Sequence, residues 1–237
     1  MEFVQVYSYA AQMAATHRGR AASEPGLLQM TGDRRKFRRE GEERRREALI
    51  AAAIELFAEG GAAAATVRAI AERAGVTPGL IRHYFTTKED LVRAAYATVM
   101  TRMTEESENA ATPSGEDPAV RLLAFVAVSL RAPVMDAERV GLWAGFLHQV
   151  WRDAEMRGVH EATYLAYRNR LEALIVALPG QGNPGTARAL AIACNGVIDG
   201  LWMEGGMLPE AFAPGELETI GLSAVRAILG LPATEPT

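Results

Sequence analysis

Apolar residues recur every three or four positions along most of the chain, the spacing of an amphipathic α-helix. The first such repeat lies within residues 42–59 and consists of Leu49, Ile50, Ala53, Ile54 and Phe57. Gly60 and Gly61 follow it and are expected to end that helix. The same spacing predicts further helices at about 118–131, 136–150, 153–178, 186–205 and 215–229. Because no stretch alternates apolar and polar residues as a strand would, the pattern predicts an all-α protein.

The segment TVRAIAERAGVTPGLIRHYF (66–85) is typical of two short helices joined by a tight turn. Thr66 and Thr77 are predicted N-caps, and Pro78 suits a first helical position because its missing N–H does no harm there. Gly75 lies where the chain must reverse, a place that favours positive φ. The residues expected to face outward are Thr77, Gly79, Arg82 and His83. The pair predicts a helix-turn-helix that presents its second helix to the DNA major groove, with an ordinary helical hairpin as the alternative.

A longer helix is expected directly after this pair. Thr86 or Thr87 would cap it, with Glu89 or Asp90 completing a capping box, and the apolar repeat continues to about Glu108. The segment TPSGEDP (112–118) is the clearest break, and the segments 179–185 and 205–215 are predicted loops from their Pro and Gly content. The expected organisation is a disordered or partly ordered basic extension (1–40), a three-helix DNA-binding domain (41–92) and a helical ligand-binding and dimerisation domain (93–237).

Charge is distributed unevenly along the chain, although its formal net value is only −4. Residues 34–93 carry 13 Lys/Arg against 9 Asp/Glu (+4), and residues 94–237 carry 10 against 17 (−7). A basic head on an acidic body is typical of a protein whose first part alone contacts phosphates. The dense run TGDRRKFRREGEERRREAL is either a solvated, partly disordered tail or an arm that follows the DNA backbone or enters the minor groove.

Several classes of protein are disfavoured by what the sequence contains. The single cysteine, Cys194, allows no intramolecular disulfide and suits a reducing cytoplasm, the expected compartment. We find no apolar run of the roughly 18–20 residues that a membrane span needs. The four histidines are scattered, and no phosphate loop or metal-ligand spacing is present. We therefore expect neither an enzyme nor a bound cofactor or metal.

The acidic body concentrates aromatic side chains, with a few polar groups among them. An effector cavity of mostly apolar lining with some polar anchors would use such residues. The candidates are Trp143, Phe146, His148, Trp151, Tyr164, Tyr167, Asn195, Asp199 and Trp202. A well-filled core without a ligand explains the same pattern equally well.

The last two predicted helices have the composition of a dimer interface. Their apolar positions are Leu190, Val197, Leu201, Ile220, Val225 and Ile228. Gly196 and Gly200 would permit a close approach of two subunits. A twofold pairing of identical surfaces is the commonest arrangement of soluble homo-oligomers.

Residues 43–103, and above all RRREALIAAAIELFAEGG and TVRAIAERAGVTPGLIRHYFTTKEDLVRAAY, resemble the N-terminal domain of TetR-family transcriptional regulators. The resemblance implies a homodimer that places two recognition helices in successive major grooves of a palindromic operator on double-stranded DNA. The DNA-binding residues that it implies are Arg46, Thr66, Arg68, Thr77, Pro78, Gly79, Arg82, His83, Tyr84 and Lys88. Pro78 and Leu80 depart from the polar residues frequent at these positions, so base recognition is expected to depend on Arg82.

The segment IDGLWMEGGM (198–207) and the preceding Trp-containing helices resemble the branch of this family around BetI, the choline-responsive repressor. This resemblance implies a ligand-responsive repressor, released from its operator by a small molecule. One hypothesis for that effector is a quaternary ammonium held by tryptophan faces and a carboxylate. A helical protein-interaction scaffold without specific DNA binding is the alternative function.

Overall fold

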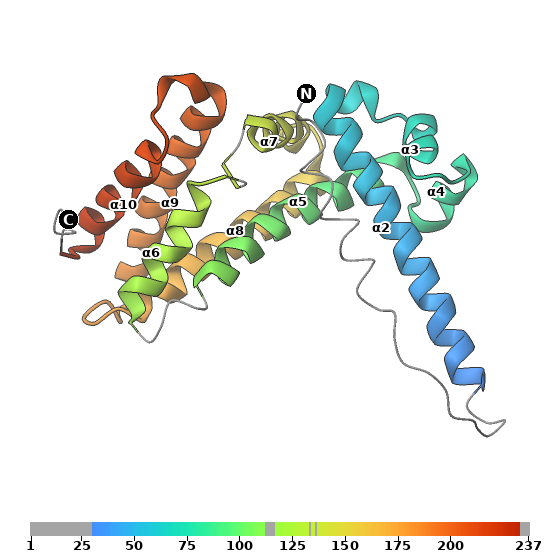
Figure 1. Cartoon of the computed structure of the whole chain (residues 1–237). Coiled ribbons are helices and arrows are strands. Elements are labelled where there is room, and N and C mark those ends of the chain that lie inside the picture. The colour runs from blue at the N-terminus through green and yellow to red at the C-terminus, as the bar shows by residue number, and fades with distance from the viewer. Residues whose placement is uncertain (1–29, 112–116, 133, 136, 233–237) are drawn as a thin grey trace. The chain divides into compact units, whose positions relative to one another are not determined.

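The computed structural model describes residues 30–111, 117–132, 134–135 and 137–232, and all regular structure among these residues is helical (Figure 1). The helices are α2 (Met30–Ala64), α3 (Val67–Arg73), α4 (Pro78–Tyr84), α5 (Lys88–Ala111), α6 (Pro118–Ser129), α7 (Ala137–Val150), α8 (Ala154–Val176), α9 (Pro184–Met207) and α10 (Glu216–Leu229). A single 3-10 turn, η1 (Pro209–Ala211), lies in a predicted loop. The all-α prediction is confirmed, and α6 to α10 begin and end within two residues of the predicted bounds.

α2 is longer than its apolar repeat. The repeat predicted a helix from about residue 42, whereas the helix already begins at Met30 and includes the charged run. Arg, Lys and Glu are good helix formers and the run contains no proline, so backbone propensity alone supports a helix there. The described chain divides between Glu43 and Arg44 into two compact units, of which the second contains α3 to α10. Residues 1–29, which make up most of the predicted extension, lie outside the described residues.

The helix pair at 66–85 forms as its turn residues predict. The Thr66 hydroxyl accepts a hydrogen bond from the Ala69 N–H at 3.1 Å, which caps α3. Gly75 has a φ of 65°, the left-handed value that glycine adopts without strain, and it turns the chain into α4. Thr77 occupies the N-cap position of α4, but the prediction that its side chain caps the helix is wrong, because its hydroxyl accepts no such bond. The Leu80 N–H donates to the Thr77 carbonyl at 2.9 Å instead, and Pro78 has no N–H to be capped.

One apolar core joins the helix pair to the start of α5. It contains Leu49, Ala53 and Phe57 of α2, Ile70 of α3, Ile81 of α4, and Leu91, Ala95 and Tyr96 of α5. The same core continues into α7 through Leu142, Phe146 and Val150. Because α3 and α4 each have only seven residues, their stability depends on this packing and not on helix propensity.

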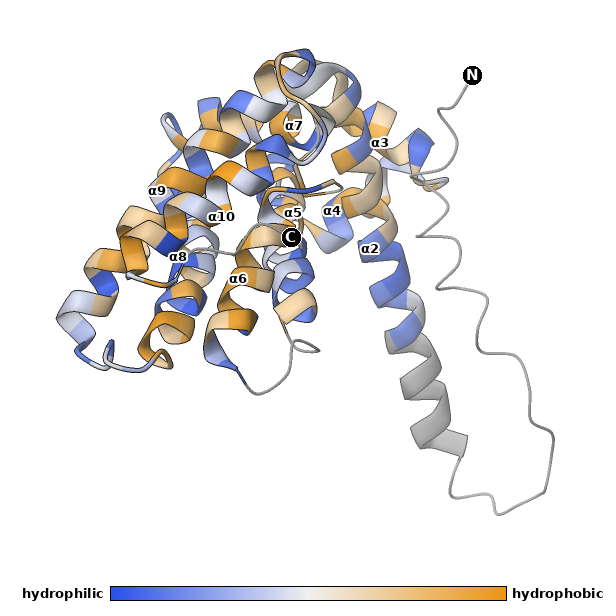
Figure 2. Ribbon diagram, turned by 60° about the vertical axis from the view of Figure 1, so that its left-hand side comes forward, coloured by the Kyte–Doolittle hydropathy of each residue, from blue (hydrophilic) through white to orange (hydrophobic). Residues whose placement is uncertain are grey.

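A second apolar core holds the body together. It lies among α6, α8, α9 and α10, and its largest fully buried side chains are Leu122, Phe125, Leu130, Leu171 and Ile175. α9 packs against α7, α8 and α10, so it is the central helix of this part. Figure 2 shows the apolar residues that recur along α6, α9 and α10. Among the described helices, none is both long and apolar enough to cross a membrane.

Candidate DNA-binding face and effector cavity

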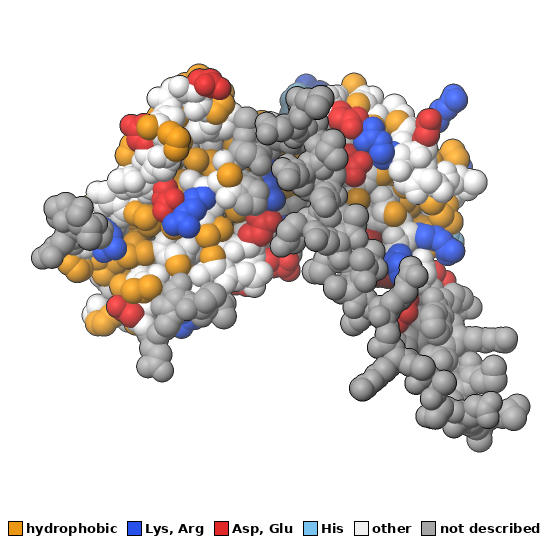
Figure 3. All heavy atoms as spheres, in the orientation of Figure 1, with side chains coloured by type: hydrophobic (Ala, Val, Ile, Leu, Met, Phe, Trp, Pro, Cys, Tyr) orange, Lys and Arg blue, Asp and Glu red, His pale blue; other side chains and the backbone are white. Residues whose placement is uncertain are grey.

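The outward face of α4 and its flanks is made of the residues that the sequence singled out. Thr66, Arg68, Thr77, Pro78, Gly79, Arg82 and His83 are all exposed. On the opposite side of α4, Ile81 is only 2% exposed and anchors the helix to the core. Figure 3 shows Lys and Arg side chains projecting from the surface formed by α3 and α4. This side of the helix pair is therefore available to a nucleic acid.

Three other predicted contacts also have structural partners. Gly60 and Gly61 have non-helical dihedral angles and kink α2 where it was predicted to end. The Lys88 ammonium donates a hydrogen bond of 3.4 Å to the Ala62 carbonyl just after this kink. The rings of Tyr84 and His83 meet edge to face at 4.9 Å. The Arg46 guanidinium lies 5.4 Å from the centre of the Phe85 ring, a cation–π distance. Arg46, Tyr84 and Lys88 are partly buried. They therefore pack against the helix pair and also lie at the edge of its exposed surface.

Arg73, which sequence reasoning missed, fastens α3 to α2. Its two terminal nitrogens donate to the Glu59 carboxylate at 2.8 and 2.9 Å, and one of them also reaches Glu55 at 3.1 Å. The hydrogen bond from Arg73 lowers the pKa of Glu59, and the bond to Glu59 raises the pKa of Arg73. Arg73 is a positioning residue for the helix pair. The sequence offers no spacing signal for it, because its partners lie on another helix.

The start of α5 is capped as predicted, by the Thr87 and Asp90 alternative. The Thr87 hydroxyl accepts from the Asp90 N–H at 3.1 Å, and the Asp90 carboxylate accepts from the Thr87 N–H at 2.8 Å. A hydrogen bond from Arg93 is the largest cause that lowers the pKa of Asp90. This box fixes where α5 begins, shortly after the end of α4.

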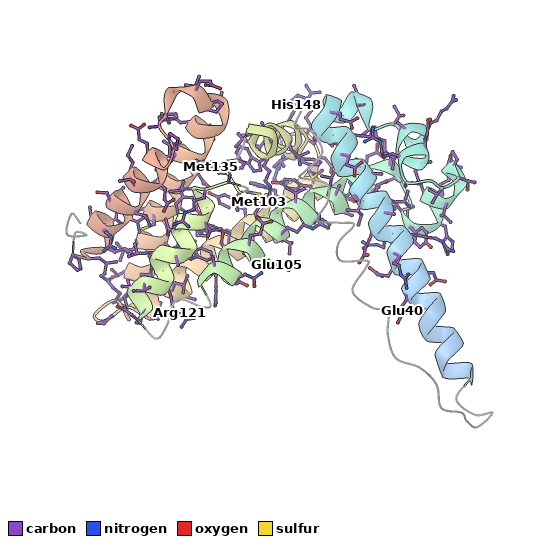
Figure 4. The ribbon with its side chains drawn as sticks, in the orientation of Figure 1. Glu40, Met103, Glu105, Arg121, Met135 and His148 are labelled. Carbon is purple, nitrogen blue, oxygen red and sulfur yellow. The ribbon has the colours of Figure 1, made fainter. Side chains whose placement is uncertain are left out.

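A cavity of about 70 Å³ lies in the body, among α5, α6, α7, α8 and α9. It is lined by Met100, Met103, Thr104, Ser107, Ser129, Val134, Trp143, Tyr164, Tyr167, Ile198, Asp199 and Trp202. Five of the nine predicted ligand residues are among them, namely Trp143, Tyr164, Tyr167, Asp199 and Trp202. The wall provided by α5, with Met103 labelled in Figure 4, was not predicted. Methionines at helical spacing are indistinguishable in sequence from core residues.

One pole of the cavity is a buried polar cluster. The Tyr164 hydroxyl donates to the Asp199 carboxylate at 2.5 Å, and the Asn195 amide donates to the same oxygen at 2.9 Å. Burial raises the pKa of Asp199, and it raises the pKa of Tyr164 to about 12. Asn195, 3% exposed, does not line the cavity but orients the carboxylate that does.

The aromatic and hydroxyl groups complete the lining. The Trp143 and Trp202 rings meet edge to face at 5.1 Å, and the Trp202 indole N–H donates to the Val134 carbonyl at 3.0 Å. The hydroxyls of Ser129 and Tyr167 share a hydrogen bond of 2.7 Å. The cavity therefore offers indole faces and neutral hydroxyls beside one carboxylate.

The three remaining predicted ligand residues lie elsewhere. Phe146 is fully buried in the first core, stacked on Phe57 with ring centres 4.5 Å apart. His148, labelled in Figure 4, is exposed on α7, and Trp151 is 80% exposed after the end of that helix. Helical periodicity placed Trp143 and Phe146 on one face of α7, but it could not tell which of them meets the cavity.

An exposed recognition helix on a helix-turn-helix, together with a cavity in a helical body, defines a class of protein: DNA-binding regulators with an effector domain. Residues 49–95 match the family model of bacterial regulatory proteins of the tetR family. Residues 118–230 match the model of the C-terminal domain of BetI-type transcriptional repressors. The chain belongs to the tetR family of helix-turn-helix transcriptional regulators.

Individual relatives agree with this assignment. The HTH-type transcriptional regulator BetI of Rhizobium meliloti is 32% identical over 67% of this chain and 76% of its own length. BetI of Burkholderia thailandensis is 29% identical over 71% of this chain and 85% of its own length. These relatives are transcriptional regulators and not enzymes, as the sequence led us to expect.

Solved structures show the same architecture. A protein described as a transcriptional regulator from Pseudomonas aeruginosa PAO1 superposes with a TM-score of 0.71 and 30% identity, covering 79% of this chain and 91% of that one. The regulator FadR of Bacillus subtilis, in complex with stearoyl-CoA, superposes with a TM-score of 0.60 and 21% identity, covering 79% of this chain and 99% of that one. The second likeness shows the fold alone.

Proposed function

We propose that the protein is a ligand-controlled repressor that binds a palindromic operator as a homodimer and is released when a small molecule enters the cavity. One observation carries this proposal: α5 begins directly after the recognition helix and also lines the cavity. Its Lys88 end follows the DNA-facing α4, and Met100, Met103, Thr104 and Ser107 form a cavity wall farther along. A shift of α5 caused by a ligand would move α4, because both helices share one core.

The DNA contacts divide by chemistry. Arg82, exposed in the last turn of α4, is proposed to contact a guanine edge. Arg68, His83 and Lys88 are proposed to contact phosphates, together with backbone N–H groups at the starts of α3 and α4. Contacts that neutralise phosphates make the affinity for DNA fall as the salt concentration rises. A contact to a base edge makes the affinity depend on the DNA sequence.

The dimer surface is proposed on α9 and α10. These helices leave Ile192, Met203 and Ile220 between 42% and 45% exposed. Gly196 and Gly200 are exposed on the same helix α9, so a second copy could approach its backbone closely. Val225, which we expected in this surface, is instead fully buried in the second core. Ile220→Asp is expected to yield a monomer in light scattering, and Val120→Asp, at a comparably exposed position on α6, a dimer.

The effector is proposed to be a compact organic cation. Trp143, Trp202 and the Asp199 carboxylate supply indole faces and one negative charge. A cavity of about 70 Å³ accepts only a small molecule unless the methionine side chains move. Calorimetry with choline and with its neutral isostere 3,3-dimethylbutan-1-ol tests the charge, and equal affinities would contradict it.

The whole proposal is tested by selecting duplexes from random DNA with the purified protein. We expect a palindromic consensus, a protein dimer in the complex, and an affinity that falls steeply with salt. Arg82→Ala should relax the consensus at one position in each half-site. Failure to enrich any sequence would favour the helical scaffold instead, and enrichment by a monomer would contradict the proposed dimer.

A further inference from the structure

A continuous series of side chains leads from the cavity to the DNA-binding core. It begins at Asp199 of α9, which accepts the hydrogen bond from the Tyr164 hydroxyl. One turn earlier on α8, the His160 ring stacks on the Tyr164 ring with centres 5.3 Å apart. His160 Nδ1 and the hydroxyl of Tyr96, on α5, share a hydrogen bond of 2.5 Å. Two hydrogen bonds and one ring stack therefore connect a cavity carboxylate to the helix that follows the recognition helix.

Tyr96 passes this connection on to α2. Its side chain is fully buried, and its ring lies 5.0 Å from the ring of Phe146. Phe146 is in turn stacked on Phe57 of α2 at 4.5 Å, with an angle of 16° between the rings. Phe57 belongs to the same core as Ile81 of the recognition helix. Tyr96 thus has its hydroxyl toward the body and its ring among the residues that hold α4.

The hydrogen bond between Tyr96 and His160 has two discrete arrangements. An imidazole protonated on Nε2 accepts the tyrosine proton at Nδ1, and one protonated on Nδ1 donates to the tyrosine oxygen instead. The Asp199 charge acts on this imidazole, raising its pKa against the larger effect of burial, which lowers it. An element with two arrangements, biased by a group in the cavity, is the physical requirement for coupling two sites.

Building on the proposed ligand control of DNA binding, we propose that the Tyr96–His160 hydrogen bond transmits the state of Asp199 to the recognition helix. A ligand that engages the Asp199 carboxylate withdraws it from Tyr164 and from the imidazole beyond. The Tyr96 bond then changes its arrangement, and the core around Phe146 and Phe57 adjusts. His160 and Tyr96 are positioning residues in this scheme, since neither lines the cavity nor lies on the DNA-facing surface.

A second route exists and must be separated from this one. Met100, Thr104 and Ser107 of α5 line the cavity directly, so ligand bulk could move α5 whether or not Tyr96 has its hydroxyl. A change confined to the Asp199 charge tests only the polar route, because it adds no bulk. Asp199→Asn makes that change while keeping an oxygen that can accept from Tyr164.

The experiment is a double-mutant cycle on operator affinity, which needs no ligand. Full-length wild type, Asp199→Asn, Tyr96→Phe and the double variant are titrated with a duplex obtained by selection on the wild type. We expect Asp199→Asn to raise the operator Kd by about fivefold or more in the wild-type background, within the usual range of allosteric couplings. In the Tyr96→Phe background the same substitution should change it by less than about twofold.

Tyr167→Phe is the matched control. It removes a hydroxyl from the same cavity, but that hydroxyl bonds Ser129 of α6 and reaches α5 only through Ser107, three turns beyond Tyr96. The effect of Asp199→Asn should persist in this background. His160→Gln alters the other partner of the Tyr96–His160 hydrogen bond and should abolish the effect of Asp199→Asn on the operator Kd, as Tyr96→Phe does. Thermal unfolding of each variant verifies that it is folded.

Equal effects of Asp199→Asn with and without the Tyr96 hydroxyl would overturn the coupling role. An Asp199→Asn variant with wild-type operator affinity would overturn it as well. Either result leaves the proposed repressor function standing, because the operator is still bound. A wild-type protein that selects no operator would instead defeat the proposed function itself.

Discussion

The Arg93 guanidinium lies 3.0 Å from the Asp153 carboxylate, and this ion pair joins the N-terminal part of α5 to the N-cap of α8. Asp153 is the N-cap of α8, accepting from the Glu155 N–H at 2.8 Å. The same guanidinium lies 2.6 Å from Asp90, which forms the capping box of α5 with Thr87. Burial acts to lower the pKa of Arg93, but the bond to Asp90 and the neighbouring carboxylates outweigh it and raise that pKa. One arginine therefore links the caps of two helices.

Arg93→Met removes the cation while keeping an aliphatic side chain, and it leaves the carboxylates facing one another. Because Arg93 is 15% exposed, its pairs are screened less than surface pairs. We expect the melting temperature to fall by roughly 2–4 °C, the shift typical for the loss of one substantial interaction in a domain of this size. Arg102→Met, at an exposed position on the same helix, is the control and should leave the melting temperature unchanged. Equal melting temperatures of the two variants would show that the bridge contributes nothing.

Gly206 lets α9 approach α7 closely. A Cβ atom at this position would overlap the Val140 side chain of α7. Gly206→Ala should therefore destabilise the protein by about 1–3 kcal/mol, the usual cost of overpacking. Gly158→Ala, in the open on α8, should stabilise it by up to about 1 kcal/mol, because alanine is the better helix former. Urea unfolding of both variants measures the change in the free energy of unfolding. An increase in both variants would mean that the Val140 side chain can move away without cost.

The helix pair was predictable because its determinants are local. The Thr66 cap, the left-handed Gly75 and the helix start at Pro78 each depend on residues within one turn of the chain. The Thr77 cap failed for the complementary reason. A side-chain rotamer at an exposed helix start depends on solvent and on a bound partner, which residue type does not specify.

The cavity was only half predictable, since it is made where five helices meet. Aromatic content indicated Trp143 and Trp202, but Met100 and Thr104 carry no mark that separates a cavity wall from a core. Arg93 was missed likewise, because its partner Asp153 is 60 residues away. Hydrophobic periodicity predicts which face of a helix is buried. It does not predict which residues of other helices pack against that face, because these are far away in the sequence.

Arg82 is the test of base recognition on the proposed operator. A bidentate contact to guanine contributes about 1–3 kcal/mol of discrimination against the wrong base. Arg82→Ala should therefore flatten the preference at one position of each half-site, measured by competition with single-substituted duplexes. Arg68→Ala should weaken binding to all these duplexes alike and reduce the salt dependence, as the loss of a phosphate contact does. The assignment fails if Arg82→Ala weakens every duplex by the same factor.

The partly buried His160 side chain should make the protein less stable as the pH falls. Burial disfavours the imidazolium and lowers the pKa of His160 below the usual 6.5, and the Asp199 charge opposes this only in part. The unfolded chain then binds the proton more readily than the folded protein does. The corresponding stability is present above pH 6.5 and is lost as the pH falls through the folded pKa.

His160→Gln removes this contribution. Its free energy of unfolding should decline less than that of the wild type between about pH 7.5 and pH 5.5, measured by urea unfolding at each pH. The raised pKa of Asp199 acts in the opposite direction, but it is present in both proteins and largely cancels in the difference. His148→Gln, the same change at an exposed position of α7, should follow the wild-type curve. Parallel curves for the wild type and His160→Gln would mean that the buried imidazole takes up its proton as readily as a free one.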